Sequence, residues 1–386
     1  MSAASHPVID PVELTRDLIR RPSVTPADEG AMDLLERVLT DLGFTCRRMP
    51  FETIENLYAR RGTASPNLCF AGHTDVVPTG SPAAWSAAPF EAEVRDGVLY
   101  GRGAVDMKGG IAAWIAAVSR LLAESDVPGS LSFLITGDEE GPALHGTKRV
   151  VEALMAEGEV IDACVVGEPS SQHALGDTIK IGRRGSLNSW ITIHGKQGHV
   201  AYPDRAANPA PVMARLMARL ADHRLDDGYQ GFQPSNLEIT TIDIGNPAAN
   251  VIPAEARARL NIRFNPTHTG DDLIAWLNAM AGEAQAESGL RIELEHLCSG
   301  NAFLTEPGPF VTGVQDAVEA AVGRRPEAST TGGTSDARFI RAMAPVLELG
   351  LVGQTMHQVD ERAPVAEIEA LAEVYRRVIT TFFDRL

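Results

Sequence analysis

The stretch "LCFAGHTDVVPTG", residues 68–80, decides what fold the chain is expected to have. Its first four residues form an apolar run that is typical of a strand buried on both faces. His73 and Asp75 follow where such a strand reaches the surface. Because residues two apart on an extended backbone point to the same face, an imidazole and a carboxylate project together from the end of a sheet.

The segments around this stretch alternate between helix-like and strand-like patterns. Helical apolar spacing is found in residues 11–21, 29–43, 109–124 and 146–158, and apolar strand-like runs in residues 67–73, 130–140 and 161–169. The same texture returns from about residue 297, with helical segments at 309–323 and 367–383. Helices between apolar strands predict an α/β fold with a mainly parallel central sheet.

A different pattern lies between these two parts. Residues 184–199 and 237–266 alternate apolar and polar side chains, as half-exposed strands do, and residues 208–222 and 270–289 have helical spacing. Two helices on an antiparallel sheet make a small α+β domain. We therefore expect a larger α/β domain formed by residues 1–183 and 297–386, and a small domain inserted between them at residues 184–296.

The composition limits the classes of partner. The chain has 386 residues, with 34 Lys and Arg against 51 Asp and Glu, a net charge of −17. So acidic a chain is a poor ligand for nucleic acid or an anionic membrane. No apolar run reaches the roughly 18 residues of a membrane span, and the N-terminus lacks the basic start and apolar core of a signal peptide. Four dispersed cysteines without C-x-x-C fit reduced thiols, so we expect a cytoplasmic protein.

Further acidic and imidazole side chains share the position of His73, just after an apolar strand. In open α/β sheets, ligands bind outside the carboxyl ends of the strands. Such groups would repel and desolvate one another without a cation, and together they suit Zn²⁺ or a similar divalent ion. They exceed the needs of one tetrahedral ion, so two ions sharing a bridging carboxylate fit better. The further candidates are Asp106, Glu139, Glu140, Glu168 and His357.

Each of these residues also has an ordinary structural interpretation. His73 could be a hydrogen-bonded loop residue, the Glu139–Glu140 pair a solvated strand end, and Asp106 the cap of the helix that starts near Gly109. Joint placement beside glycines at strand ends favours the metal site. Other chemistries lack their motifs, because the chain has no G-x-S-x-G, H-E-x-x-H or P-loop, and "GRGAVDMKGG" is not a dinucleotide fingerprint.

Six motifs resemble the di-zinc aminoacylase and carboxypeptidase family, in the family's order along nearly the whole chain. They are "GHTDVVPTG", "GRGAVDMKGG", "DEEGPALHGT", "GEPS", "GKQGHVAYPDRAANP" and "MHQVDE". The resemblance implies two Zn²⁺ per subunit, with Co²⁺ able to substitute, and a homodimer formed through the inserted domain, which also acts as a lid.

The resemblance also implies a role for each matching residue. One zinc would be bound by His73 and Glu168, the other by Glu140 and His357, with Asp106 bridging them. Asp75 would orient the His73 imidazole through its other ring nitrogen. Glu139 would be the general base, taking a proton from water and passing it to the leaving amine.

The resemblance extends to residues beyond these ligands, in the inserted domain and at its borders. His199 would reach the active site across the dimer and stabilise the developing oxyanion. The positions expected to contact a substrate with several carboxylates are Arg183, Asn250, Arg263 and Thr334.

The segments "KIGRRGS", "ANVIPAEARARLNIRF" and "TGGTSDARF" narrow the match to a branch that hydrolyses N-succinyl-LL-2,6-diaminopimelate to succinate and LL-2,6-diaminopimelate, a step towards lysine. Gly353 stands where that branch usually has Asn. The alternatives are a related N-acyl amino acid amidohydrolase, such as acetylornithine deacetylase or an aminoacylase, and a non-catalytic binding homologue.

Overall fold

The computed structural model describes residues 6–385. The chain divides into two compact units, described separately below. Unit 1 comprises Met1–Ile181, Thr305–Ser329 and Ser335–Leu386, and unit 2 comprises Gly182–Leu304 and Thr330–Thr334. The predicted return to the first domain at residue 297 falls inside a strand of unit 2, β15 (Arg291–Gly300), because that strand pairs along the whole of β10 (Gly185–His194).

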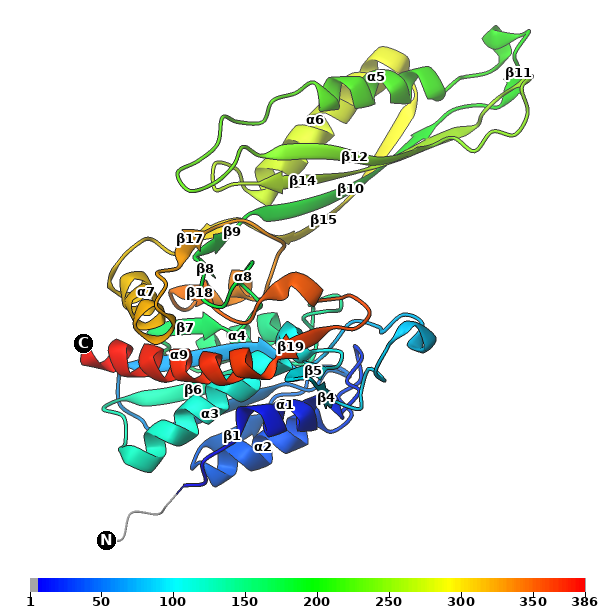
Figure 1. The fold of residues 1–386 in the computed structure, drawn as a ribbon. Helices are drawn as coiled ribbons and strands as arrows, with labels where there is room; N and C mark the ends of the chain where they lie inside the picture. The colour runs from blue at the N-terminus through cyan, green and yellow to red at the C-terminus, as the bar shows by residue number, and fades with distance from the viewer. Residues whose placement is uncertain (1–5, 386) are drawn as a thin grey trace. The chain divides into compact units, whose positions relative to one another are not determined.

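Unit 1 contains an eight-stranded sheet in the order β1-β2-β6-β3-β7-β18-β8-β17. Its middle pairs, β6–β3, β3–β7 and β7–β18, are parallel, and β1 and β2 join antiparallel at one edge. This confirms the predicted α/β fold with a mainly parallel central sheet (Figure 1). The strands are β1 (Thr45–Arg48), β2 (Leu57–Arg61), β3 (Asn67–His73), β6 (Ser130–Thr136), β7 (Ala163–Val166), β8 (Thr178–Lys180), β17 (Glu327–Ser329) and β18 (Val346–Glu348).

Helices cover this sheet. Four of them pack as neighbours in the order α1-α3-α9-α7, and a second group consists of α2, which contacts β1 and β2, and of α4 and α8, which contact each other. A buried aromatic group ties β3 to two helices, since Phe70 stacks on Trp114 of α3 at 4.8 Å and lies 5.8 Å from Tyr375 of α9. The helices are α1 (Pro11–Ile19), α2 (Ala31–Asp41), α3 (Gly109–Glu124), α4 (Thr147–Ala156), α7 (Pro309–Val322), α8 (Ala337–Ile340) and α9 (Val365–Asp384).

A smaller sheet of unit 1, in the order β19-β5-β4, lies outside the main sheet. It is antiparallel and consists of β4 (Glu93–Arg95), β5 (Val98–Tyr100) and β19 (Arg362–Pro364). Through it, the segment before Asp106 pairs with the segment after His357.

Unit 2 has the α+β architecture that its alternating pattern predicts. Its antiparallel sheet has the order β12-β14-β10-β15, and helices α5 and α6 pack against it over an apolar core (Figure 1). A two-stranded ribbon, β11 with β13, follows the end of β10, and β9 pairs with β16. The remaining elements are β9 (Gly182–Arg183), β11 (Gly198–His199), α5 (Ala210–Ala221), β12 (Asn236–Asp243), β13 (Val251–Ile252), β14 (Glu255–Phe264), α6 (Gly270–Ser288) and β16 (Phe303–Leu304).

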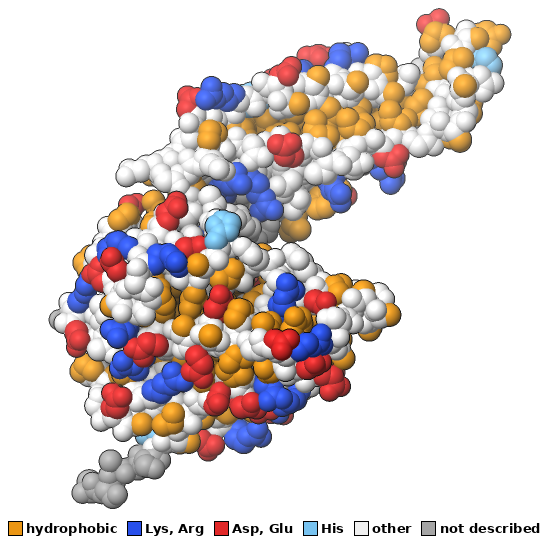
Figure 2. Space-filling model, in the orientation of Figure 1, with side chains coloured by type: hydrophobic (Ala, Val, Ile, Leu, Met, Phe, Trp, Pro, Cys, Tyr) orange, Lys and Arg blue, Asp and Glu red, His pale blue; other side chains and the backbone are white. Residues whose placement is uncertain are grey.

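Two further predictions concern the whole chain. Within residues 6–385, no helix combines the length and the apolar character that crossing a bilayer requires. Cys69 and Cys164 are buried, as their strand positions predict, whereas Cys46 and Cys298 are only partly buried. On the face shown in Figure 2, acidic and basic side chains of unit 1 are interspersed.

Candidate active site

The predicted ligands of unit 1 meet at the carboxyl ends of parallel strands. His73 is the last residue of β3, which runs parallel to β6 and β7; Glu139 and Glu140 follow β6, and Glu168 follows β7. The strand ends carry glycines because the space beside them is filled. A Cβ added to Gly72 would lie 2.5 Å from the methyl carbon of Met107.

Asp106 lies between the two halves of this site. It lies in the segment Ala104–Lys108 that precedes α3, at a kink where its own backbone is extended (φ −120°, ψ 94°), and it is buried. Its Oδ1 lies 3.3 Å from Nε2 of His73, and its Oδ2 lies 3.1 Å from Nε2 of His357. One carboxylate therefore faces an imidazole on each side, which is the arrangement a bridging ligand requires.

Each half of the site also contains a further carboxylate. Nε2 of His73 lies 3.7 Å from Oε1 of Glu168, and Nε2 of His357 lies 2.9 Å from Oε1 of Glu140. Ligand atoms of His73, Asp106 and Glu140, and likewise of His73, Glu139 and Glu168, lie within 4.8 Å of one another. The structure thus brings together all six residues that the sequence analysis names as candidates for the metal site.

Asp75 supports the site, but the group that contacts His73 is its main chain rather than its side chain. His73 Nδ1 contacts the backbone carbonyl of Asp75 at 2.9 Å, whereas the nearer carboxylate oxygen is 3.7 Å away. The carboxylate instead accepts the hydroxyl of Thr25 at 2.6 Å and the backbone N–H groups of Glu139 and Glu140 at 3.2 and 3.0 Å. Asp75 therefore orients His73 through its main chain and the two glutamates through its side chain.

The electrostatics of the cluster follow from burial and crowding. Burial opposes protonation of His73, yet Asp106, Glu168 and Asp75 together raise its pKa well above the ordinary value. Hydrogen bonds to Asp106 and Glu140 raise the pKa of His357 to about 10. Burial and the charge of Asp106 raise the pKa of Glu168 well above its usual range. Positive charge is therefore strongly favoured among these carboxylates.

The side-chain atoms of the site are suitable ligands for divalent cations. Nε2 of His73 and Oδ1 of Asp106 are buried side-chain atoms without a hydrogen-bond partner in the part of the chain that the structure describes. Buried polar atoms left unpaired are costly and call for an explanation such as a bound ion. Imidazole nitrogens and carboxylate oxygens are zinc ligands, and a carboxylate between two such groups suits a pair of ions.

Glu139 differs from its neighbour Glu140 in its surroundings. Burial, reinforced by Asp336, Glu140 and Asp106 and opposed by His73, raises the pKa of Glu139 to about 8. A general base works best when its pKa lies near the operating pH. The side chain is thus suited to exchanging a proton rather than to holding a fixed charge.

The remaining predicted residues fall into two groups within unit 2, which also contains Arg183 and Thr334 although the predicted bounds placed these two in the first domain. His199 and Asn250 lie together: β11 pairs with β13, and the backbone N–H of Val200 donates to the carbonyl of Asn250 at 3.1 Å. Both residues are exposed.

The second group lies near the start of β10. Arg183 precedes β10, is largely buried, and donates to the carbonyl of Thr331 at 3.0 Å, three residues from Thr334. Arg263 on β14 pairs with Ser186 at the start of β10. The ten residues of β10 separate this group from His199, a span of roughly 33 Å at the usual strand rise.

Sequence reasoning missed a buried ion pair beside the cluster. Arg102 donates to Glu361 at 2.6 Å, and these side chains are 2% and 0% exposed. Both stand in quoted motifs, "GRG" and "HQVDE", but nothing in the sequence pairs residues 259 positions apart.

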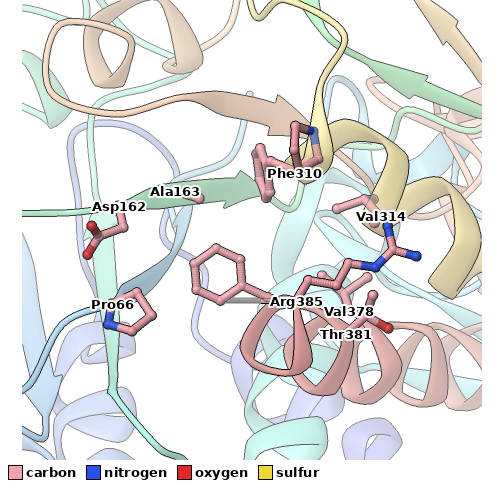
Figure 3. Close-up of a pocket in the computed structure, with 11 residues that line it drawn as sticks. Pro66, Asp162, Ala163, Phe310, Val314, Val378, Thr381 and Arg385 are labelled. Carbon is pink, nitrogen blue, oxygen red and sulfur yellow. The ribbon is translucent and has the colours of Figure 1, made fainter.

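A separate pocket of unit 1 lies elsewhere, at the amino ends of β3 and β7. It has a volume of about 340 Å³ and is lined mainly by apolar residues, including Pro66, Phe310 and Val378 (Figure 3). Its two charged residues have partners of their own, because Asp162 accepts the N–H of Asn67 and Arg385 pairs with Asp316. None of the predicted site residues lines it.

Comparison with known proteins places this site in a class. The family model of peptidase family M20/M25/M40 matches residues 69–381, so the chain belongs to this family. Solved structures share the fold: an M20 family metallo-carboxypeptidase from Sulfolobus solfataricus has a TM-score of 0.81 and 16% identity, covering 98% of this chain and 100% of that one. A dinuclear metal binding peptidase of the M20 family from Bacillus subtilis has a TM-score of 0.73 and 16% identity, covering 97% and 98%.

Curated relatives are much more similar in sequence. Succinyl-diaminopimelate desuccinylase from Caulobacter vibrioides (strain NA1000 / CB15N) is 66% identical over 377 residues, which are 97% of this chain and 96% of the relative. The protein of the same name from Phenylobacterium zucineum (strain HLK1) is 63% identical over 383 residues, 99% of this chain and all of the relative.

Proposed function

We propose that the protein is a metal-dependent amidohydrolase that cleaves N-succinyl-LL-2,6-diaminopimelate to succinate and LL-2,6-diaminopimelate. The observation that carries this proposal is the placement of Asp106 between His73 and His357, with Glu168 and Glu140 beside them. The substrate comes from the relatives that are 63–66% identical over nearly the full length and carry the desuccinylase name.

Two divalent ions, zinc in our proposal and cobalt as a substitute, fit this ligand set. Their bridge would be Asp106, with His73 and Glu168 on one side and Glu140 and His357 on the other. When bound, such ions polarise the amide carbonyl and lower the pKa of water. The main-chain carbonyl of Asp75 holds His73 in place, and the side chain of Asp75 holds Glu140.

Glu139 moves the proton in this proposal. It lies beside His73 and Glu168 in the cluster, where a carboxylate can take a proton from the attacking water and return it to the departing amine. The amine leaves as a neutral group only when this proton reaches it. The backbone N–H of Glu139, and not its carboxylate, donates to Asp75, so this contact leaves the carboxylate available for that transfer.

The substrate has several carboxylates, and unit 2 supplies the complementary groups in this proposal. Arg183 and Arg263 provide guanidinium groups suited to carboxylates, and Thr334 a hydroxyl group. His199 and Asn250 lie at the other end of β10, roughly 33 Å away by strand rise. One site that uses both groups therefore needs His199 and Asn250 from a second copy of the chain.

A homodimer through unit 2 follows from this separation. Unit 2 also exposes large apolar side chains, among them Tyr202, Ile242 and Leu297 at 55%, 51% and 54%. Figure 2 shows hydrophobic side chains gathered on the visible face of this unit. Exposed apolar surface of this kind is typical of association sites.

A titration of metal-free protein tests the proposal. Chelator-treated protein should release no succinate from the substrate, and activity should rise with added Zn²⁺ until about two equivalents per chain are bound. Active protein from which elemental analysis recovers no divalent metal would contradict the proposal.

A further inference from the structure

A buried ion pair joins the chain segments that carry two of the proposed metal ligands. Arg102 stands four residues before Asp106, and Glu361 stands four residues after His357. Nη1 of Arg102 donates to Oε2 of Glu361 at 2.6 Å. The two ligand segments also meet in the main chain, because β5 pairs with β19 and the N–H of Gly101 donates to the carbonyl of Glu361 at 2.9 Å.

The second oxygen of Glu361 reaches the segment of Asp106. Oε1 accepts the backbone N–H of Val105 at 3.1 Å and that of Asp106 at 3.2 Å. One carboxylate thus accepts hydrogen bonds from two successive backbone N–H groups, the second of which belongs to Asp106. Charged acceptors make stronger hydrogen bonds than neutral ones, so this contact firmly holds the backbone from which the Asp106 side chain projects.

Arg102 reaches the segment of His357 in the same way. Its guanidinium donates to the carbonyl of Gln358 at 3.2 Å and, more weakly, to the carbonyl of His357 at 3.5 Å. It also donates to the carbonyl of Pro78 at 3.3 Å and lies over the ring of Trp85 at 5.3 Å. The planar fork of an arginine can make several such bonds at once, whereas a lysine makes fewer and in less fixed directions.

The backbone at His357 needs this support. Its φ is 63°, in the left-handed region that residues with a Cβ rarely adopt. Such a conformation persists only where surrounding contacts impose it. The contacts of Arg102 with the carbonyls of residues 357 and 358 are contacts of this kind.

The Asp106 segment is also held on its other side. The buried ammonium group of Lys108 donates to the carbonyls of Leu18 and Arg21 at 3.0 and 2.8 Å, at the end of α1. Lys108 fixes this segment to the body of unit 1, and its two hydrogen bonds go to the end of α1 rather than to the His357 segment. The Arg102–Glu361 pair, in contrast, is hydrogen-bonded to both segments.

We propose that Arg102 and Glu361 act as a positioning pair that sets the distance between the Asp106 and His357 side chains and thereby the affinity of the site for its second metal ion. This inference rests on the proposed function, because it assumes that the site binds divalent ions. The pair touches neither ion nor substrate. It acts through the backbone of the two ligand segments, and outer contacts of this type are typically worth about 10–100-fold in metal affinity.

The variants Arg102→Lys and Glu361→Gln test the inference. Arg102→Lys keeps the buried charge opposite Glu361 but loses the fork to the carbonyls. Glu361→Gln keeps an acceptor for the two N–H groups but turns an amide donor towards Arg102. Zinc affinity is measured on metal-free, folded protein by competition with a chromophoric chelator, and the absorption spectrum of the Co²⁺-loaded form reports the ligand geometry. We expect about 10–100-fold weaker binding of one of two ions and an altered cobalt spectrum.

The pair Arg60–Glu159 provides the matched control. It also joins distant segments of unit 1, with side chains 23% and 19% exposed, and it touches no proposed ligand. Arg60→Lys and Glu159→Gln should lower the unfolding temperature of metal-free protein without changing zinc affinity.

Each outcome is decisive. Folded Arg102→Lys and Glu361→Gln proteins with unchanged zinc affinity would overturn the inference, as would an equal loss in the control pair. If Glu361→Gln does not fold, Arg102→Lys decides, because it leaves no unpaired buried charge. Failure of both to fold beside folded controls would show a purely structural pair. A wild-type chain that binds no zinc would instead refute the proposed function.

Discussion

The carboxylate of Asp75 accepts the backbone N–H of Glu140 at 3.0 Å and that of Glu139 at 3.2 Å. The histidine segment after β3 thus holds the two glutamates after β6, so that a proposed ligand and the proposed base share one support. Asp75 also accepts the hydroxyl of Thr25 at 2.6 Å. All three groups donate hydrogen bonds to the carboxylate. An NH2 group at this position would face these donors and could not bond to them.

Asp75→Asn is therefore expected to lower turnover about 10–100-fold, because its amide group would oppose the N–H groups of Glu139 and Glu140. Steady-state kinetics and zinc analysis on the same preparation measure the effect. Thr25→Val is the control: it removes one donor and leaves the two N–H contacts, so its loss should be much smaller. Equal losses in the two variants would assign Asp75 no special support of the glutamates.

Glu139→Gln is expected to keep both metal ions and lose turnover by about 10²–10⁴-fold, since general-base catalysis typically contributes that much. Glu140→Gln, the same change one residue on, should lose metal because Glu140 faces His357 at 2.9 Å. Rates and metal content of the two variants separate these roles. Normal turnover in Glu139→Gln would place the base elsewhere.

Complementation tests the proposed dimer. His199→Ala and Glu139→Gln homodimers should each be nearly inactive, since one loses an oxyanion donor, worth about 10²–10³-fold in turnover, and the other loses the base. A mixed dimer has one site with an intact Glu139 and the His199 of the partner. Subunit exchange should therefore restore part of the activity. If mass spectrometry shows mixed dimers while activity stays at the level of the single variants, His199 does not act across subunits.

Asp226 of unit 2 predicts a dependence of stability on pH. Burial alone would raise its pKa, but hydrogen bonds from Ser235, Gly228 and Asn265 outweigh burial and lower the pKa from 3.8 to about 2. A pKa lowered by folding stabilises the protein above the unfolded value, and this stabilisation is lost as the pH falls through the folded value. The carboxylate also faces Nε2 of His268 at 3.1 Å.

Asp226→Asn should therefore destabilise unit 2 at neutral pH by about 1–3 kcal/mol, because the amide keeps one acceptor oxygen but loses the charge and turns an NH2 group towards Ser235 and His268, which contact Oδ2. The difference from wild type should shrink between pH 4 and pH 2, the window set by the two values. Denaturant unfolding at several pH values measures it. Asp227→Asn, whose side chain is 86% exposed, is the control and should behave as wild type. A difference that stays constant down to pH 2 would contradict the account.

The positions of the proposed ligands could be predicted because strand ends are visible in a sequence. His73, Glu140 and Glu168 each follow an apolar run, and parallel strands bring such ends to one edge of a sheet. The use of the Asp75 side chain could not be predicted in the same way. Alternation shows that Asp75 shares a face with His73. It does not show that the backbone N–H groups of Glu139 and Glu140 lie closer to the Asp75 carboxylate than the His73 ring does.

The architecture of both domains could be predicted from the sequence, but one domain boundary could not. The α/β and α+β parts have different periodicities, so both architectures follow from the pattern. The point at which the chain leaves unit 2 does not, because β15 continues through residue 297 by pairing with β10, a contact between distant segments. The Arg102–Glu361 pair was hidden for the same reason, since a charged residue in a loop motif looks solvated until its partner is known.

The most direct test of the central claim is a comparison of kcat/KM for N-succinyl-LL-2,6-diaminopimelate and its N-acetyl analogue on the zinc-loaded protein. The two substrates share the amine and the amide and differ by one carboxylate, which the proposed guanidinium groups bind. The account predicts a preference of about 10²-fold or more for the succinyl substrate, because a site built around a polar group rejects analogues that lack it. Equal rates, or faster release of acetate, would contradict the account and identify a different amidohydrolase of the same family.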